Sequence, residues 1–133
     1  IPLTKDKKIL MVNQWRFGSS SFSWEMPGGV VDPGEDKIEA ATRELVEETG
    51  YVGENPRLIG QSSPNPAILN NLVSFVLFED CYASQSHQWD LHEEIQVAAF
   101  TMKEILQMVE SGLIHNAITF NSLFYLQQAY PHL

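Results

Sequence analysis

The chain has 133 residues, of which 44% are hydrophobic and 19% are charged, proportions typical of one globular domain around one hydrophobic core. The net charge is −9 at pH 7 with only eight Lys and Arg residues, so we expect no general affinity for nucleic acid or for an anionic membrane. A polyanionic substrate would therefore need a local positive centre, such as a bound metal ion.

The single cysteine and the short apolar runs bear on compartment and membranes. Cys81 has no second cysteine with which to form an internal disulfide, which favours a reducing, cytoplasmic location. The longest apolar runs, such as LVSFVLF, are too short to span a bilayer, so we expect no membrane partner. The chain begins with Ile1 rather than Met, close to an expected strand, and we expect that an N-terminal segment is missing.

The first third of the chain predicts a strand followed by a long loop. Residues 7–15, KKILMVNQW, alternate loosely and are rich in β-formers, which predicts a strand. Glycine, serine and proline are frequent in residues 16–36, which we expect to be mostly loop, with short strands near Trp24 and Val30.

A helix is predicted over residues 36–49. Asp36 and Glu39 have the spacing of a capping box at its start, and Gly50 is a favourable stop. Its apolar residues recur at helical spacing and predict a face that packs on a core: Ile38, Ala41 and Leu45.

The rest of the chain predicts three more strands and two more helices. The predicted strands are residues 57–63, 70–82 and 95–101, and the predicted helices are residues 102–111, ended by Gly112, and 116–130, capped by Asn116. Residues 84–94 are expected to be a polar loop. This order of elements predicts an α/β sandwich with a mixed sheet, formed by residues 1–133 as a single domain.

Three glutamates lie together on the helix predicted over residues 36–49. Glu44 faces both Glu47 and Glu48, because residues three and four apart on a helix are neighbours, and each such like-charge pair costs roughly 0.2–0.5 kcal/mol. A solvated face in which Arg43 pairs with Glu39 and Glu47 is one interpretation. The other is a site for Mg²⁺ or Mn²⁺, which prefer such oxygen ligands, approached by the glycine-rich turn before the helix.

The wider spacing favours the metal site. Gly29, Glu35, the pair Arg43-Glu44, the apolar Leu45, the pair Glu47-Glu48 and Gly50 stand at fixed intervals, and this pattern resembles the Nudix box at all seven fixed identities. Tyr51 departs from the aliphatic residue usual at the last position. The flanks NQWRFGSSSFSWEMPGG and FTMKEILQMVESGLIHNAITFNSLFYL resemble the branch that acts on nucleoside diphosphate sugars.

The resemblance implies a fold, a cofactor and a set of site residues. Nudix enzymes use Mg²⁺ or Mn²⁺ to hydrolyse a nucleoside diphosphate linked to another group, and the box forms a loop–helix–loop on an α/β/α sandwich. By position, Glu44, Glu47 and Glu48 correspond to metal ligands, joined by the backbone carbonyl of Gly28. The other fixed residues correspond to those that hold loop and helix together: Gly29, Glu35, Arg43 and Gly50.

The substrate is indicated by weaker signals. Pro66 follows Gly50 by sixteen residues, a distance that resembles the ADP-ribose pyrophosphatase subgroup, although prolines are common in loops. Arg16 has a guanidinium fork suited to phosphate, and Trp15 either stacks on the base or belongs to the core. We expect Trp24 to be a core residue.

Two pairs of carboxylates are candidates for the catalytic base. One is Glu47 or Glu48 of the box. The other is Glu93 or Glu94 of the polar loop, of which we prefer Glu93 because it lies deeper in the loop, although the pair is equally compatible with a solvated loop. The histidines have no ligand spacing and are expected at the surface or in packing: His87, His92, His115 and His132.

The sequence thus predicts a Mg²⁺- or Mn²⁺-dependent hydrolase of a nucleoside diphosphate sugar, ADP-ribose first, giving AMP and a sugar phosphate. The alternatives are a nucleoside triphosphate or dinucleoside polyphosphate pyrophosphohydrolase, and a Nudix-fold sensor that binds nucleotide sugars without turnover. The aromatic residues in QWRFGSSSFSW suggest a homodimer.

Overall fold

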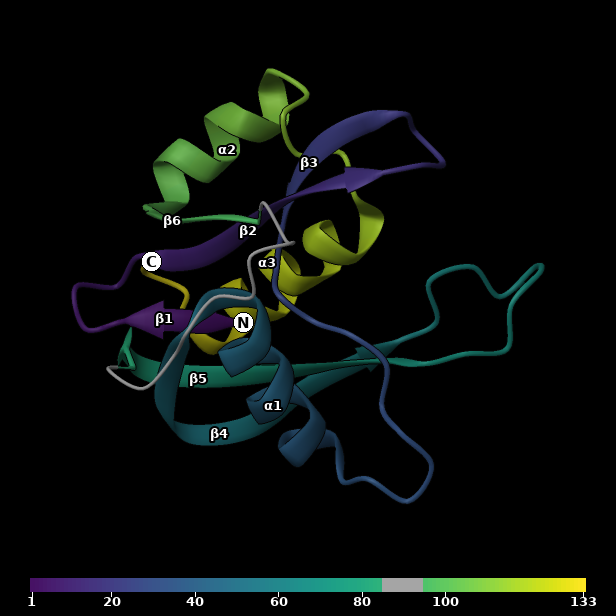
Figure 1. Ribbon diagram of the computed structural model, residues 1–133. Coiled ribbons are helices and arrows are strands. Elements are labelled where there is room, and N and C mark those ends of the chain that lie inside the picture. Colours follow the sequence, from purple (N-terminus) through teal and green to yellow (C-terminus); the bar gives the residue numbers. More distant parts are fainter. Residues whose placement is uncertain (85–94) are drawn as a thin grey trace.

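The computed structural model describes residues 1–84 and 95–133, and it is shown in Figure 1. Its strands are β1 (Pro2–Thr4), β2 (Ile9–Arg16), β3 (Ser21–Glu25), β4 (Tyr51–Ser62), β5 (Val73–Ala83) and β6 (Gln96–Phe100). Its helices are α1 (Lys37–Thr49), α2 (Met102–Glu110) and α3 (Ala117–Ala129). No helix in the described ranges is long and apolar enough to cross a membrane.

The strands form one mixed sheet in the order β3-β2-β1-β5-β4, with β6 paired to β2 outside this path. β1 and β5 run parallel, whereas β1–β2, β2–β3, β2–β6 and β4–β5 are antiparallel pairs. The predicted α/β class with a mixed sheet is therefore confirmed.

Strand β5 supplies residues to both layers of the sandwich, because successive side chains of a strand point to opposite faces. Phe75 and Leu77 belong to a core cluster that also holds Ile105 of α2 and Leu126 of α3. Val76 and Phe78 of the same strand join a second cluster with Leu45 of α1. The sheet is thus covered by α1 on one face and by α2 and α3 on the other (Figure 1).

Helix α1 begins and ends where local chemistry predicts. The carboxylate of Asp36 accepts hydrogen bonds from the backbone N–H groups of Ile38 and Glu39, which satisfies two donors of the first turn. Gly50 has φ 69° and ψ 11°, a left-handed conformation that glycine adopts without steric cost, and its N–H donates to the carbonyl of Val46. These caps fix the helix that carries the box glutamates.

Two strand predictions differ from the structure, one in where the strand begins and one in whether a strand forms at all. β4 begins at Tyr51, although its predicted start was residue 57, because Gly53, Pro56 and Asn55 (φ 49°) resemble a turn and are accommodated as irregularities in the pairing with β5. Near Val30 the chain forms no strand, so that part of the prediction is wrong. This stretch is an irregular loop in which the backbone carbonyl of Val30 accepts a hydrogen bond from Arg43.

Candidate active site

A cavity of about 550 Å³ lies beside the loop that precedes α1. The loop contributes Gly28 and Gly29, α1 contributes Glu44, and β2 and β3 contribute Arg16 and Glu25. Its opposite wall comes from β5, α3 and the β4–β5 connection, including Asn71, Leu72, Thr119 and Ser122. The cavity therefore brings two of the predicted metal ligands, Gly28 and Glu44, together with the cation of Arg16.

The guanidinium of Arg43 connects the loop to the helix. Its Nε donates to Oε1 of Glu35 at 3.0 Å, and its Nη2 donates to the carbonyl of Val30 at 3.2 Å. Its Nη1 donates to Glu44 at 2.7 Å and to Glu47 at 3.1 Å. The hydrogen bonds that Arg43 donates to Glu35 and then to Glu44 raise the pKa of Arg43, and its fork lowers the pKa of Glu35. One cation thus offsets the repulsion between two box glutamates.

The backbone of Gly29 passes directly against Glu44. A Cβ atom at this position would overlap the Glu44 carboxylate group. A side chain at this position would therefore displace the Glu44 carboxylate, so space rather than backbone conformation favours glycine here.

Glu48 is held by two neutral donors. The side-chain amide of Gln14 on β2 donates to Oε1 at 2.8 Å, and the backbone N–H of Gly28 donates to Oε2 at 2.9 Å. Burial raises the pKa of Glu48, and the bonds from Gly28 and Gln14 oppose that shift. Sequence analysis did not single out Gln14, although its place two residues before Arg16 on one strand puts both side chains on one face.

Arg16 is engaged by Glu25 across the β2–β3 pair. Its Nε donates to both carboxylate oxygens at 3.1 Å and its Nη2 donates to Oε2 at 2.7 Å. Glu25 is only 3% exposed, and its hydrogen bonds raise the pKa of Arg16. Arg16 lines the cavity while its fork is fixed by a buried carboxylate, and contact with a phosphate remains a prediction.

The described residues match the donor chemistry of Mg²⁺ or Mn²⁺ without forming a closed set of ligands. Glutamate and backbone oxygens are the hard donors that these ions prefer. Glu48 combines partial burial with two uncharged partners, so a cation would supply the missing charge balance. Within residues 1–84 and 95–133, however, no three acidic, histidine or cysteine side chains meet closely enough to hold a metal. The glutamates instead bond Arg43, Gln14 and Gly28.

Several other predicted residues lie away from the cavity. Trp15 is 45% exposed and packs edge-on against Phe22, so the core interpretation is wrong, yet it does not line the cavity. Pro66 belongs to the β4–β5 connection, which reaches away from the sheet in Figure 1, and it does not line the cavity either. Trp24 packs on the core and edge-on against Phe100, as predicted.

The other residues considered in the sequence analysis are the histidines and the two candidate bases outside the box. Some of them lie at the surface and the others lie outside the described residues. His115 is exposed, with its ring near the hydroxyl of Ser21 and the carbonyl of Gly112, and His132 is also exposed. The rest lie outside the described residues: His87, His92, Glu93 and Glu94.

Comparison with families of known proteins matches residues 1–118 to the NUDIX domain. The chain belongs to the Nudix family. This confirms the resemblance inferred from the box.

Two relatives and one solved structure show which members of the family this chain is similar to. The chain is 30% identical to an ADP-ribose pyrophosphatase of Bacillus subtilis (strain 168) over 128 residues, which cover 96% of this chain and 69% of that protein. The chain is also similar to a CMP-5'-(N-acetyl-N-hydroxy-3-aminopropyl)phosphonate hydrolase of Streptomyces rubellomurinus (strain ATCC 31215), with 49% identity over 92 residues. This alignment covers 62% of this chain and 45% of that protein. A crystal structure of an ADP compounds hydrolase superposes with a TM-score of 0.86 at 23% identity, covering 98% of this chain and 70% of that one, and establishes the shared fold.

Proposed function

We propose that this Nudix protein hydrolyses the diphosphate of a nucleoside diphosphate sugar, ADP-ribose first, to a nucleoside monophosphate and a sugar phosphate. The observation that carries the proposal is the complete box on α1 and its flanking loops, with Gly28, Gly29 and Glu44 lining a cavity of about 550 Å³. The repulsive cluster of box glutamates is retained in full, which argues against a sensor that has lost turnover.

We assign the metal to the box carboxylates. Glu44, Glu47 and Glu48, with the carbonyl of Gly28, would hold Mg²⁺ or Mn²⁺. The ion supplies polarisation of the phosphoryl oxygens and a lowered pKa for a bound water. The protein's own contribution is to orient these carboxylates through Arg43 and Gln14 and to present Arg16 to the nucleotide. Glu93 or Glu94 remains our candidate for the base.

The choice of nucleotide rests on the relatives. Those named for ADP-ribose or ADP compounds align over almost the whole chain, which supports an adenine nucleotide. The shorter but more similar match carries a cytidine nucleotide in its name, so a CMP-linked substrate is the second candidate. Nucleoside triphosphates and dinucleoside polyphosphates are the third, because they share the box and differ only in the pocket.

A substrate panel tests the proposal. Purified protein is incubated with Mg²⁺ or Mn²⁺ and ADP-ribose, a CMP-linked phosphonate, a nucleoside triphosphate or a dinucleoside polyphosphate, and the products are separated and identified. We expect AMP and ribose phosphate from ADP-ribose, at a rate abolished by a chelator. Preferential cleavage of a triphosphate would overturn the substrate assignment, and no cleavage of any compound would overturn the hydrolase assignment.

Three properties of the whole chain accompany the proposal. We propose that residues 1–133 form a single catalytic domain, supported by two core clusters that share one sheet. We also propose a homodimer, supported by the exposed Trp15, Phe17 and Phe22 of the β2–β3 hairpin. Light scattering that finds an active monomer at nanomolar concentration would refute the dimer. The buried free thiol of Cys81 supports a cytoplasmic location.

A further inference from the structure

We infer that Gln14 is a positioning residue, which holds Glu48 in the orientation that receives the divalent cation. The inference rests on the proposed function and adds to it a residue outside the box. It starts from the difference between Glu48 and the other two box glutamates. Glu44 and Glu47 share the cation of Arg43, whereas the hydrogen-bond donors to Glu48 among the described residues are both uncharged.

The bonds to Glu48 come from two separate elements. Gln14 lies on β2, 34 residues before Glu48, and Gly28 lies in the loop before α1. One oxygen of Glu48 is therefore fixed by the sheet and the other by the loop. This arrangement defines the plane of the carboxylate as well as its position, which a single bond does not do.

Uncharged donors suit a metal ligand better than a cation does. A carboxylate has about four lone-pair positions, so each Glu48 oxygen retains one after accepting a hydrogen bond. An amide donor carries no full positive charge, so the negative charge of Glu48 remains available to a divalent ion. Arg16, the nearest cation on the same face of β2, is bonded through its fork to Glu25. The two bonds thus order Glu48 without placing a charged donor on it.

The chain offers a variant that removes only the donor. Gln14→Met preserves length and approximate volume but has no N–H group, while Gln14→Asn keeps the amide and shortens its reach. The matched control is Gln96→Met, because Gln96 also lies on a strand and bonds a neighbouring side-chain amide, that of Asn13, at 3.2 Å. Gln96 does not line the cavity.

The measurement is Mn²⁺ binding without nucleotide, by titration calorimetry or by the loss of the free Mn²⁺ signal in electron paramagnetic resonance. Losing a hydrogen bond to a metal ligand commonly weakens metal affinity by 10–100-fold, so we expect the Kd of Gln14→Met to rise about tenfold. Gln14→Asn should fall between that variant and wild type, and Gln96→Met should match wild type. The Mn²⁺ concentration for half-maximal activity should rise with the Kd, while kcat at saturating Mn²⁺ changes little.

The outcomes separate this inference from the proposed function. If Gln14→Met binds Mn²⁺ as tightly as wild type, the inference is wrong, even if its melting temperature in chelator falls. If wild type binds Mn²⁺ but cleaves no nucleotide, the proposed function fails while the role of Gln14 stands. If wild type binds neither Mn²⁺ nor Mg²⁺, both are overturned.

Discussion

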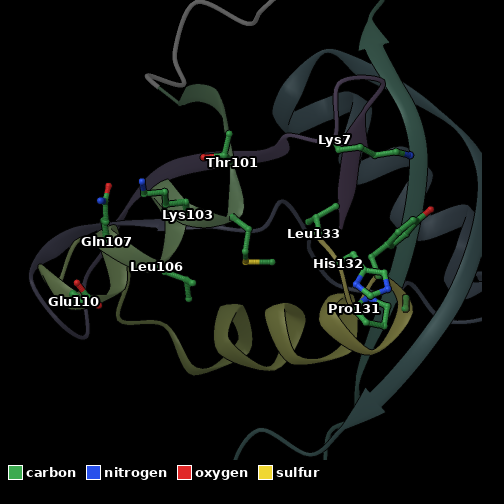
Figure 2. A pocket seen from close by; sticks show the side chains of 12 residues that line it. Lys7, Thr101, Lys103, Leu106, Gln107, Glu110, Pro131, His132 and Leu133 are labelled. Carbon is green, nitrogen blue, oxygen red and sulfur yellow. The ribbon is translucent and has the colours of Figure 1, made fainter.

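A cavity of about 900 Å³ lies between α2 and the C-terminal residues, and a smaller one of about 550 Å³ lies beside the Nudix box. The larger cavity has apolar walls that include Met102, Leu106 and Leu133. Figure 2 shows Lys7 and Lys103 on opposite sides of it, from different elements of the fold. Its charged side chains therefore do not gather at one point.

The smaller cavity differs in how its charges are arranged. Its lining residues Arg16, Glu25 and Glu44 take part in short ion pairs, and Glu44 belongs to the group around Arg43. Volume alone would favour the larger cavity as the active site, whereas the convergence of fixed charges favours the one beside the box, in agreement with our proposal. Desolvation and ion pairing are what allow a site to stabilise charge during a reaction, and empty space supplies neither.

The sharpest test of this comparison exchanges for glutamine Glu48, whose carboxylate accepts a hydrogen bond from the cavity residue Gly28, and one glutamate of the larger cavity. Glu48→Gln keeps the size and removes the charge of a proposed metal ligand, so we expect kcat to fall about a thousand-fold, as when a group that stabilises transition-state charge is lost. Glu110→Gln, in the lining of the larger cavity, should retain wild-type activity. Steady-state rates in Mg²⁺ and thermal melting check both variants. Normal turnover by Glu48→Gln would refute the metal assignment.

The second test asks whether residues 84–94 supply a charge that the site beside the box lacks. Glu93→Gln and Glu94→Gln each remove one candidate base, and the sequence predicts a strand entry in which adjacent side chains point to opposite faces. We expect a loss of about a hundred-fold for one variant, Glu93→Gln by preference, and little for the other. Single-turnover rates at saturating metal provide the measurement. If neither variant loses turnover, the role of base returns to the box helix.

Arg43→Lys tests whether the cation that organises the box is structural. Lysine keeps the charge but lacks the fork that reaches Glu35, Glu44 and Glu47 together. We expect the melting temperature to fall by about 4 °C together with a moderate loss of activity. A large loss of activity at an unchanged melting temperature would instead indicate direct contact with substrate.

The smallest expected effect concerns the close contact of the loop with α1. Gly29→Ala places a methyl group against the carboxylate of Glu44, which must rotate away, so we expect about tenfold lower affinity for Mg²⁺, similar to loss of a ligand's supporting contact. Gly18→Ala is the control, because nothing lies within 4 Å of a Cβ atom there. Equal affinity for Mg²⁺ in both variants would show that metal binding does not depend on the present position of Glu44.

The parts of the structure that sequence reasoning predicted depend on neighbours along the chain. Asp36 and Gly50 act within one turn of the helix they delimit, and the box is a spacing on that helix and its preceding loop. The contact between Gln14 and Glu48 escaped prediction because it depends on how β2 is placed against α1. Such placement is a property of packing, which a local pattern does not contain.

Long-range pairing also explains the remaining differences. Arg16 and Glu25 meet only because of the register of the β2–β3 hairpin, which the Gly- and Ser-rich sequence between them does not specify. β4 extends through Gly53 and Pro56 because β5 supplies a long partner that tolerates its irregularities. Its local sequence favoured a loop, and tertiary pairing overrode that preference.

Because β5 alternates between the two core clusters, the fold should tolerate changes of chain length very unevenly. Inserting or deleting one residue between Phe75 and Phe78 would turn every later side chain of the strand to the opposite face and exchange the contents of the two cores. The connection between β4 and β5, which includes Pro66, lies outside both strands, so its length does not determine which face of the sheet a core side chain points to. A tag or fluorescent reporter inserted there should leave the protein folded, whereas a single-codon deletion in β5 should abolish folding.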